Sequence, residues 1–128
     1  MKNVSPEEII KLVLDESFRI HTDIGPGMLE NVYMTCLSRM LSKQGLHVET
    51  EKAVPVVYEG VKMACGYRAD IVVEDCVVVE VKAIEAIGQL QVAQVLTYLR
   101  FLQLRYGLII NFHALHLKDG IKRIVNGY

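Results

Sequence analysis

Hydrophobic residues recur with two different spacings along the 128-residue chain. Up to about residue 44 they return every three or four positions, as on one face of a helix. From His47 the spacing changes to two and β-branched residues become frequent, which is typical of strands. The pattern therefore predicts two helices, then several antiparallel strands, a third helix and a further strand.

The first two helices have recognisable ends. Ser5 followed by Pro6 and Glu8 has the composition of a capping box, which predicts a helix over about residues 5–21. A second helix is expected from about Pro26 to Gln44. Six of its residues share a face at 100° per residue, and Glu30 lies at the border of that face. The predicted buried residues are Leu29, Val32, Tyr33, Cys36, Leu37 and Met40.

The pattern in the second half of the chain predicts a sheet whose strands are interrupted by one helix. Glu59–Gly60 is a plausible turn, and strands are predicted over residues 61–63, 67–73 and 77–82. A helix over about 86–104 is apolar around most of its circumference, which predicts burial on more than one side. Strands over 106–112 and 120–125 would close a single domain spanning residues 1–128.

Asp70 precedes the mostly apolar stretch of residues 71–81, and Glu80 and Lys82 lie at its end. Asp70 and Glu80 pair directly only if a three-residue turn is centred on Asp75; a two-residue turn would put Glu80 on the other face. Lys82 follows two residues later and therefore points to the same face as Glu80. A functional role thus predicts the three-residue turn, with both carboxylates on one side.

The residues alone leave the purpose of these charges open. Opposed residues have Cβ atoms about 4.5–5.5 Å apart, so two carboxylates repel each other unless a cation lies between them. A divalent cation would satisfy both carboxylates. Lys82 could instead form a structural ion pair, or the charges could belong to a solvated strand face.

Composition narrows the classes of function. The net charge is −1, so no overall positive field indicates a nucleic-acid binder acting alone. Hydrophobic residues make up 52%, which fits either a homodimer interface or a well-filled core. Cys36, Cys65 and Cys76 lack a C-x-x-C spacing and predict reduced thiols in a cytoplasmic protein. Neither a signal peptide nor a membrane span is expected.

Several ordered motifs resemble one known family. Asp70 followed by Glu80-x-Lys82 is similar to the signature of the PD-(D/E)XK nuclease superfamily, although Ala69 stands where the name has proline. "GPGMLENVY" resembles the G-x-x-E-x-x-Y motif of its GxxExxY branch, and "QVAQVLTYLR" resembles the Q-x-x-x-Y helix of exonuclease-like members. "GLIINF" and "GIKRIV" are similar to its closing segments, so the resemblance covers roughly residues 5–126.

The resemblance implies a fold and a metal site. The fold would be α/β (α+β), a restriction-endonuclease-like core with a central mixed β-sheet and an antiparallel hairpin unit flanked by helices. Asp70 and Glu80 would hold Mg²⁺ or Mn²⁺, and the Val81 carbonyl would add a further ligand. Glu30 would bind the metal directly or through water.

The resemblance also implies roles around the metal. Lys82 would position or deprotonate the attacking water and contact the phosphate. Gln94 would orient Lys82 or a phosphate, and Tyr98, one helical turn later, would line the site. Gln91 lies in the same stripe of the helix. A polar seam that satisfies hydrogen bonds in the core is the alternative for this stripe.

Three functions follow from these patterns. The first is a nuclease that cleaves DNA or RNA by attack of a metal-activated water. The second is a non-catalytic nucleic-acid- or protein-binding module on the same fold, dimeric or part of a larger complex. The third is an oligomeric structural protein, for which the two-residue turn is predicted, with Asp70 and Glu80 facing apart.

Overall fold

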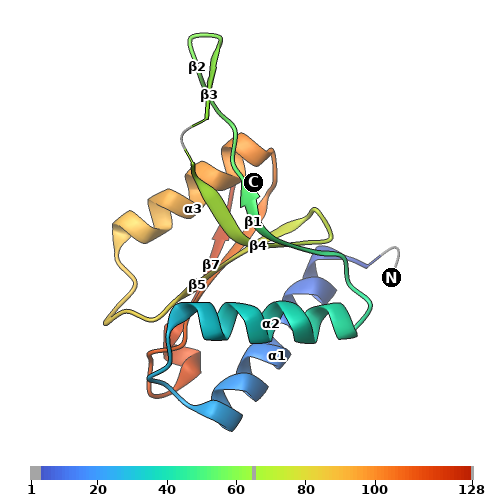
Figure 1. The fold of residues 1–128 in the computed structure, drawn as a ribbon, viewed down its shortest axis with the longest axis vertical. Helices are drawn as coiled ribbons and strands as arrows, with labels where there is room; N and C mark the ends of the chain where they lie inside the picture. Colours follow the sequence, from blue (N-terminus) through green and yellow to red (C-terminus); the bar gives the residue numbers. More distant parts are fainter. Residues whose placement is uncertain (1–3, 65, 128) are drawn as a thin grey trace.

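A five-stranded sheet with helices on both faces forms the body of the protein (Figure 1). It is seen in a computed structural model that describes residues 4–64 and 66–127. The elements in chain order are α1 Pro6–Ile24, α2 Glu30–Lys43, β1 Val48–Ala53, β2 Val56–Tyr58, β3 Val61–Met63, β4 Arg68–Val73, β5 Val77–Lys82, α3 Gln89–Leu102, β6 Tyr106–Asn111, the 3₁₀ helix η1 Leu117–Gly120 and β7 Ile121–Val125.

The sheet is mixed, in the strand order β1-β4-β5-β6-β7. β1, β4 and β5 form an antiparallel unit, β6 is parallel to β5, and β7 is antiparallel to β6. Helix α3 makes the crossover between β5 and β6, because parallel neighbours cannot be joined by a tight turn. The predicted fold class, a restriction-endonuclease-like mixed sheet flanked by helices, is confirmed.

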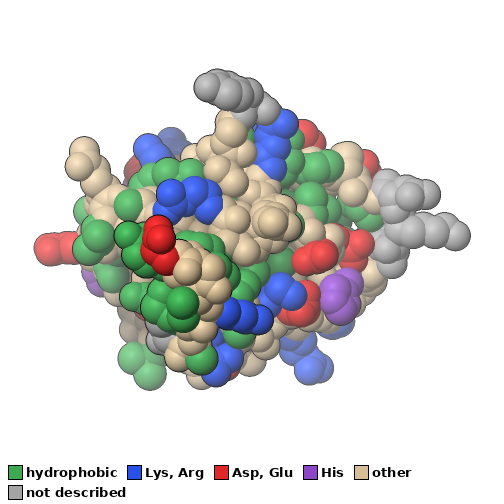
Figure 2. Space-filling model, turned by 90° about the horizontal axis from the view of Figure 1, so that it is seen from above, with side chains coloured by type: hydrophobic (Ala, Val, Ile, Leu, Met, Phe, Trp, Pro, Cys, Tyr) green, Lys and Arg blue, Asp and Glu red, His purple; other side chains and the backbone are tan. Residues whose placement is uncertain are grey.

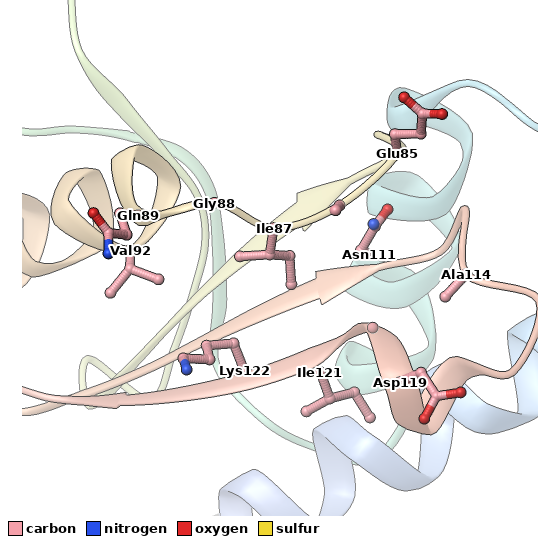
Figure 3. A pocket seen from close by; sticks show the side chains of 12 residues that line it. Glu85, Ile87, Gly88, Gln89, Val92, Asn111, Ala114, Asp119, Ile121 and Lys122 are labelled. Atoms are coloured by element: carbon pink, nitrogen blue, oxygen red, sulfur yellow. The ribbon is translucent and has the colours of Figure 1, made fainter.

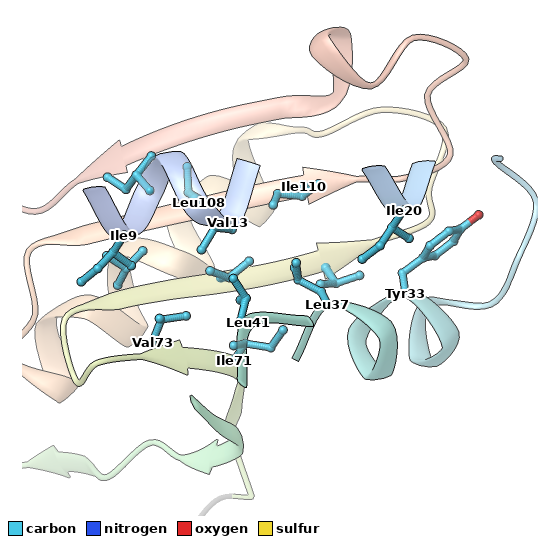
Figure 4. Packing of buried hydrophobic residues seen from close by; sticks show 14 of the residues in the cluster. Ile9, Val13, Ile20, Tyr33, Leu37, Leu41, Ile71, Val73, Leu108 and Ile110 are labelled. Carbon is cyan, nitrogen blue, oxygen red and sulfur yellow. The ribbon is translucent and has the colours of Figure 1, made fainter. Parts of the chain in front are cut away.

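One face of the sheet is covered by α1 and α2. Their buried side chains meet those of the central strands in a continuous apolar cluster (Figure 4). Tyr33 is fully buried in it and stacks on Phe112, with 4.4 Å between ring centroids. The labelled members come from two helices and from β4 and β6, so this cluster joins segments distant in sequence.

The opposite face is covered by α3. Val95, Tyr98 and Leu99 are its buried residues, and they pack on the sheet in a second, smaller cluster. The helix lies so close to β6 that a Cβ at Gly107 would be 2.8 Å from Val95 Cγ1, which explains glycine at that position. The prediction that α3 is buried on more than one side is wrong, since Leu90 is 79% exposed.

The N-terminal ends of the first two helices differ from each other. Ser5 and Glu8 form the predicted capping box on α1. Helix α2 begins at Glu30 rather than near Pro26, because Gly25 and Gly27 adopt positive φ values, which interrupt a helix. Leu29 is therefore an exposed cap residue, and the buried face of α2 carries Tyr33, Leu37 and Leu41.

The hairpin β2–β3 projects from the body at the end of the molecule nearest β1 and α3 (Figure 1). Its turn is the predicted Glu59–Gly60, and both residues have positive φ, as a type I′ turn requires. Val57, Tyr58 and Val61 are exposed on it. The prediction for Cys65 lies outside the described residues, and no helix among those described is long and apolar enough to cross a membrane.

Candidate active site

The turn between β4 and β5 sets the register of the charged residues. Val73 pairs with Val77 and Ile71 with Val79, so Glu74–Cys76 form a three-residue turn. Continuing this register places Asp70 opposite Glu80. The predicted register is confirmed, and the two-residue turn expected of the structural-protein hypothesis is not found.

Beyond Ile71, the side-chain carboxylates of Asp70 and Glu80 accept hydrogen bonds from backbone amides across β4 and β5. The Asp70 amide donates to Glu80 Oε1 at 3.0 Å, and the Val81 amide donates to Asp70 Oδ2 at 2.9 Å. Each carboxylate thus binds a backbone N–H of the opposite strand. These bonds hold both carboxylates at the end of the hairpin unit.

Both carboxyl groups resist ionisation. Burial, reinforced by the charge of Asp70, raises the pKa of Glu80 to about 8, and Glu80 is only 3% exposed. Burial also raises the pKa of Asp70, although its bond from the Val81 amide acts in the opposite direction. The protein on its own therefore keeps a proton on this pair near neutral pH.

Glu30 approaches the pair from the start of α2. Its Oε2 accepts a hydrogen bond of 3.0 Å from the Ala83 amide, directly after β5. Its charge is one of the causes that raise the pKa of Asp70, so the two carboxylates interact. This position near Asp70 is compatible with the metal-ligand role that the family resemblance implies for Glu30, which stays a prediction.

The G-x-x-E-x-x-Y segment fixes the position of Glu30. The Tyr33 hydroxyl donates to the Gly25 carbonyl at 2.6 Å and accepts from the Met28 amide at 3.0 Å. Because Tyr33 is buried and packed on Phe112, these bonds tie the glycine turn to the core. Tyr33, whose burial the sequence predicted, is therefore a structural part of the motif.

A third acidic residue near Asp70 was missed by the sequence analysis. Glu51 on β1 lines a cavity of about 200 Å³ together with Glu30 and Asp70. The pairs Thr50–Ile71 and Lys52–Ala69 place it opposite Asp70. The alternation of β1 could have indicated Glu51 only if the register between β1 and β4 had been known.

The remaining predicted site residues come together on the side of α3. Lys82, Gln91, Gln94 and Tyr98 all line one cavity of about 510 Å³. Neither the Lys82 ammonium nor the Gln94 amide has a hydrogen bond or an ion pair within the described part of the chain. Both polar groups are therefore available to a ligand.

Gln91 and Tyr98 have different surroundings in this cavity. The side-chain oxygen of Gln91 accepts a 2.7 Å bond from the Gly88 amide and so caps α3. Tyr98 is 5% exposed, and burial together with the charges of Glu80 and Asp70 raises its pKa to about 12. The Tyr98 hydroxyl therefore keeps its proton and lies within the electrostatic range of the carboxylate pair.

The sequence profile of the PD-(D/E)XK nuclease superfamily matches residues 7–124. The chain belongs to this superfamily. No curated protein and no solved structure matches it. Membership of the PD-(D/E)XK nuclease superfamily confirms the family resemblance and supports a nuclease-like function on a nucleic-acid substrate.

PD-(D/E)XK nucleases typically use divalent metals, and the carboxylate pair fits such an ion. Mg²⁺ takes one or two carboxylates and fills its other positions with water. A cation would relieve the repulsion that helps to raise the pKa of Glu80. Over residues 4–64 and 66–127, no three His, Cys, Asp or Glu side chains are arranged to hold a metal ion. Asp70 and Glu80 are therefore the two carboxylates of the predicted ligand set that the hairpin itself brings together.

A larger cavity lies beside the loop that precedes α3 (Figure 3). Its volume is about 610 Å³, and it lies between the 85–89 segment, η1 and the start of β7. None of the predicted site residues lines it. Asn111, at its edge, accepts from the Ile84 and His113 amides and donates to the Ile84 carbonyl, so its polar atoms are occupied.

Proposed function

We propose that this protein is a metal-dependent nuclease that hydrolyses phosphodiester bonds of DNA or RNA. The observation that carries the proposal is the pair of the half-buried Asp70 and the buried Glu80. Burial raises the pKa of both carboxyl groups, and the nearby Lys82 charge opposes part of this effect. The crowded carboxylates of Asp70 and Glu80 suit a cation. The Lys82 ammonium, which has no ion pair among the described residues, suits a phosphate. Within the superfamily, the Gly27-x-x-Glu30-x-x-Tyr33 segment supports assignment to the GxxExxY branch.

Asp70 and Glu80 would hold the Mg²⁺ or Mn²⁺ ion. Glu30 would contribute directly or through a water, and the Val81 carbonyl would be a further ligand. When bound, the ion would lower the pKa of a water and offset negative charge on the phosphate. Asp70 and Glu80 would give up the proton held by the pair when a metal binds, because only ionised carboxylates are good ligands.

The polar groups on the α3 side would position the attacking water and bind the phosphate. Lys82 positions the attacking water and donates to a phosphate oxygen. Gln94 orients Lys82 or the phosphate from the same cavity. Tyr98, protonated at neutral pH, lines the site as a hydrogen-bond donor. Gln91 lines it too and keeps the start of α3 in place.

A non-catalytic binding module on the same fold is the competing function. It is favoured by the net charge of −1, which supplies no overall attraction for a polyanion. In this case the protein would act as a dimer or inside a larger complex that provides a basic surface. A binding module has no need to hold a divalent ion at Asp70 and Glu80.

Calorimetry with Mn²⁺, paired with cleavage of labelled DNA and RNA, tests the proposal. Asp70→Asn and Glu80→Gln keep the side-chain shapes but remove the charges. Each is expected to weaken Mn²⁺ binding by at least about tenfold, the lower limit for residues that merely support metal ligands. Asp75→Asn in the exposed turn is the matched control and should bind like wild type.

The two readouts separate the competing functions. Metal-dependent cleavage that disappears in both variants, while Asp75→Asn remains active, supports the nuclease. Wild-type protein that neither binds Mn²⁺ nor cleaves any substrate at millimolar metal would overturn it. Nucleic-acid binding that persists without metal or cleavage would favour the binding module.

A further inference from the structure

Two cavities adjoin under the β2–β3 hairpin. The cavity lined by Lys82 and Gln94 measures about 510 Å³, and a second one of about 440 Å³ lies along the base of the hairpin. Val54 and Tyr67 line both, so the two cavities lie on either side of these residues. We call the combined surface the hairpin groove. Its inner end lies near the carboxylate pair, because the lining residues Lys82 and Tyr98 both interact electrostatically with Asp70 and Glu80.

The charge of the hairpin groove differs from that of the whole protein. Lys62, Arg68 and Lys82 line it, and no Asp or Glu does so among the described residues. Arg100 adds a cation near its edge, with Nη2 at 3.3 Å from the hydroxyl of the lining Thr97. Seen from the hairpin end, Lys and Arg side chains lie among hydrophobic ones, with some acidic side chains nearby (Figure 2). The groove is therefore locally basic although the net charge is −1.

Aromatic rings line the same groove. Tyr67 is 50% exposed and belongs to both cavities, whereas Tyr98 and Phe101 line the part beside the carboxylate pair. The Tyr67 hydroxyl forms no hydrogen bond within the described residues, and half of the residue is exposed and so accessible to a base. The larger cavity of Figure 3 differs, since Glu85 and Asp119 line it and no aromatic residue does.

We propose that the hairpin groove binds a single-stranded polynucleotide and directs the bound strand to the carboxylate pair. Cations along a groove with aromatic rings suit a flexible polyanion whose bases are unstacked. A duplex keeps its bases stacked, so they would be unavailable to Tyr67. Arg68 and Lys62 would contact phosphates while a base stacks on Tyr67. The inference rests on the proposed nuclease function for its direction, but the binding can be measured without catalysis.

Fluorescence anisotropy in a chelator, with full-length protein and no divalent metal, tests the groove. The probes are labelled oligo(dT), oligo(U) and a DNA duplex of equal length. We expect either single strand to bind at least about tenfold more tightly than the duplex, and comparison of oligo(dT) with oligo(U) identifies the preferred sugar. Duplex binding that equals or exceeds single-strand binding, or no single-strand binding at low salt, would overturn the proposal.

Variants locate the binding surface. Tyr67→Ala is expected to weaken single-strand binding about tenfold, because one stacked base contributes about 1–3 kcal/mol. Tyr67→Phe should retain it. Phe18→Ala, which removes an exposed aromatic ring from α1, is the matched control. An equal loss in Tyr67→Ala and Phe18→Ala would show that the groove is not the binding surface.

The salt dependence adds a readout that a folding defect would not produce. Arg68→Ala should reduce the slope of log affinity against log salt concentration by about 0.7, the value for one lost phosphate contact on a single strand. Arg39→Ala, on the exposed side of α2, should leave the slope unchanged. An unchanged slope in Arg68→Ala would remove Arg68 from the phosphate contacts and contradict the groove.

The outcomes for the groove and for the nuclease are distinguishable. Metal-dependent cleavage of duplex alone, unaffected by Tyr67→Ala, would keep the nuclease and reject the groove. Single-strand binding that depends on Tyr67 and Arg68, without cleavage in Mg²⁺ or Mn²⁺, would keep the groove and reject the catalytic function.

Discussion

The core under α1 and α2 and the end of the β4–β5 hairpin unit are built on different principles, although they share the same two strands. In the core, Ile71, Val73, Val77 and Val79 pair in a regular ladder and are fully buried. Directly beyond the Ile71–Val79 pair, backbone amides donate to carboxylates instead of to the opposite backbone. The first region buries apolar surface, and the second buries groups that prefer water.

The two regions contribute to the stability of the fold with opposite signs. Apolar burial stabilises the fold at about 25 cal/mol per Å². Burial of Glu80 acts in the opposite direction, as its pKa of about 8 indicates. The hydrophobic core must therefore supply the stability that lets the site retain a disfavoured pair of carboxyl groups. Such an arrangement is common at functional sites.

Breaking the apolar region should have the largest effect on stability. Leu37 on α2 is fully buried in the core beneath the sheet. Leu37→Ala is expected to lower the free energy of unfolding by about 2–5 kcal/mol, because it removes apolar contacts and leaves a cavity. Urea unfolding measures this. Leu90→Ala, on the exposed side of α3, should change it by less than about 0.5 kcal/mol, and similar losses in both would contradict the contrast.

In the polar region, Glu80 should make the free energy of unfolding of the metal-free protein depend on pH. The folded-state pKa of Glu80 is raised from 4.5 to about 8, so the folded protein holds a proton that the unfolded chain releases. The contribution of Glu80 to stability is therefore full below about pH 4.5 and is lost as pH rises towards 8.

Glu80→Gln removes this titration. Relative to wild type, it should gain at least about 1.4 kcal/mol between pH 5 and pH 9, the equivalent of one pKa unit. Urea unfolding in a chelator at both pH values checks this, with Glu85→Gln as the control. A relative stability that does not change with pH would mean that Glu80 ionises normally in the folded protein.

The smallest loss of stability is expected at Tyr33, which connects the hydrophobic core to the segment before Glu30. Tyr33→Phe keeps the ring stacked on Phe112 but leaves the Gly25 carbonyl and the Met28 amide without their side-chain partner. We expect a loss of about 1 kcal/mol in unfolding free energy. Hydrogen exchange of the Met28 amide should become faster, since the segment before Glu30 is released. Tyr106→Phe, whose hydroxyl has no hydrogen bond among the described residues, should change neither quantity.

Much of the fold could be predicted because its signals are local. The period of the hydrophobic residues located the three α-helices and the main strands but not the short 3₁₀ helix η1, and the capping box at Ser5 is a local feature. The start of α2 was predicted too early, because positive φ values at Gly25 and Gly27 override an otherwise helical pattern. The burial of α3 was overestimated, since composition does not tell which apolar side chains find a partner.

The sequence by itself determined the charged triad and its register. The spacing of Asp70 and Glu80 around a three-residue turn depends only on neighbouring residues of one hairpin. Tertiary structure alone decided which groups gather around that triad. Glu51 and Glu30 reach Asp70 from other elements, and Tyr67 lies opposite α3 across a cavity. Their proximity and the raised pKa of Glu80 arise from long-range packing and burial, which no local pattern of residues encodes.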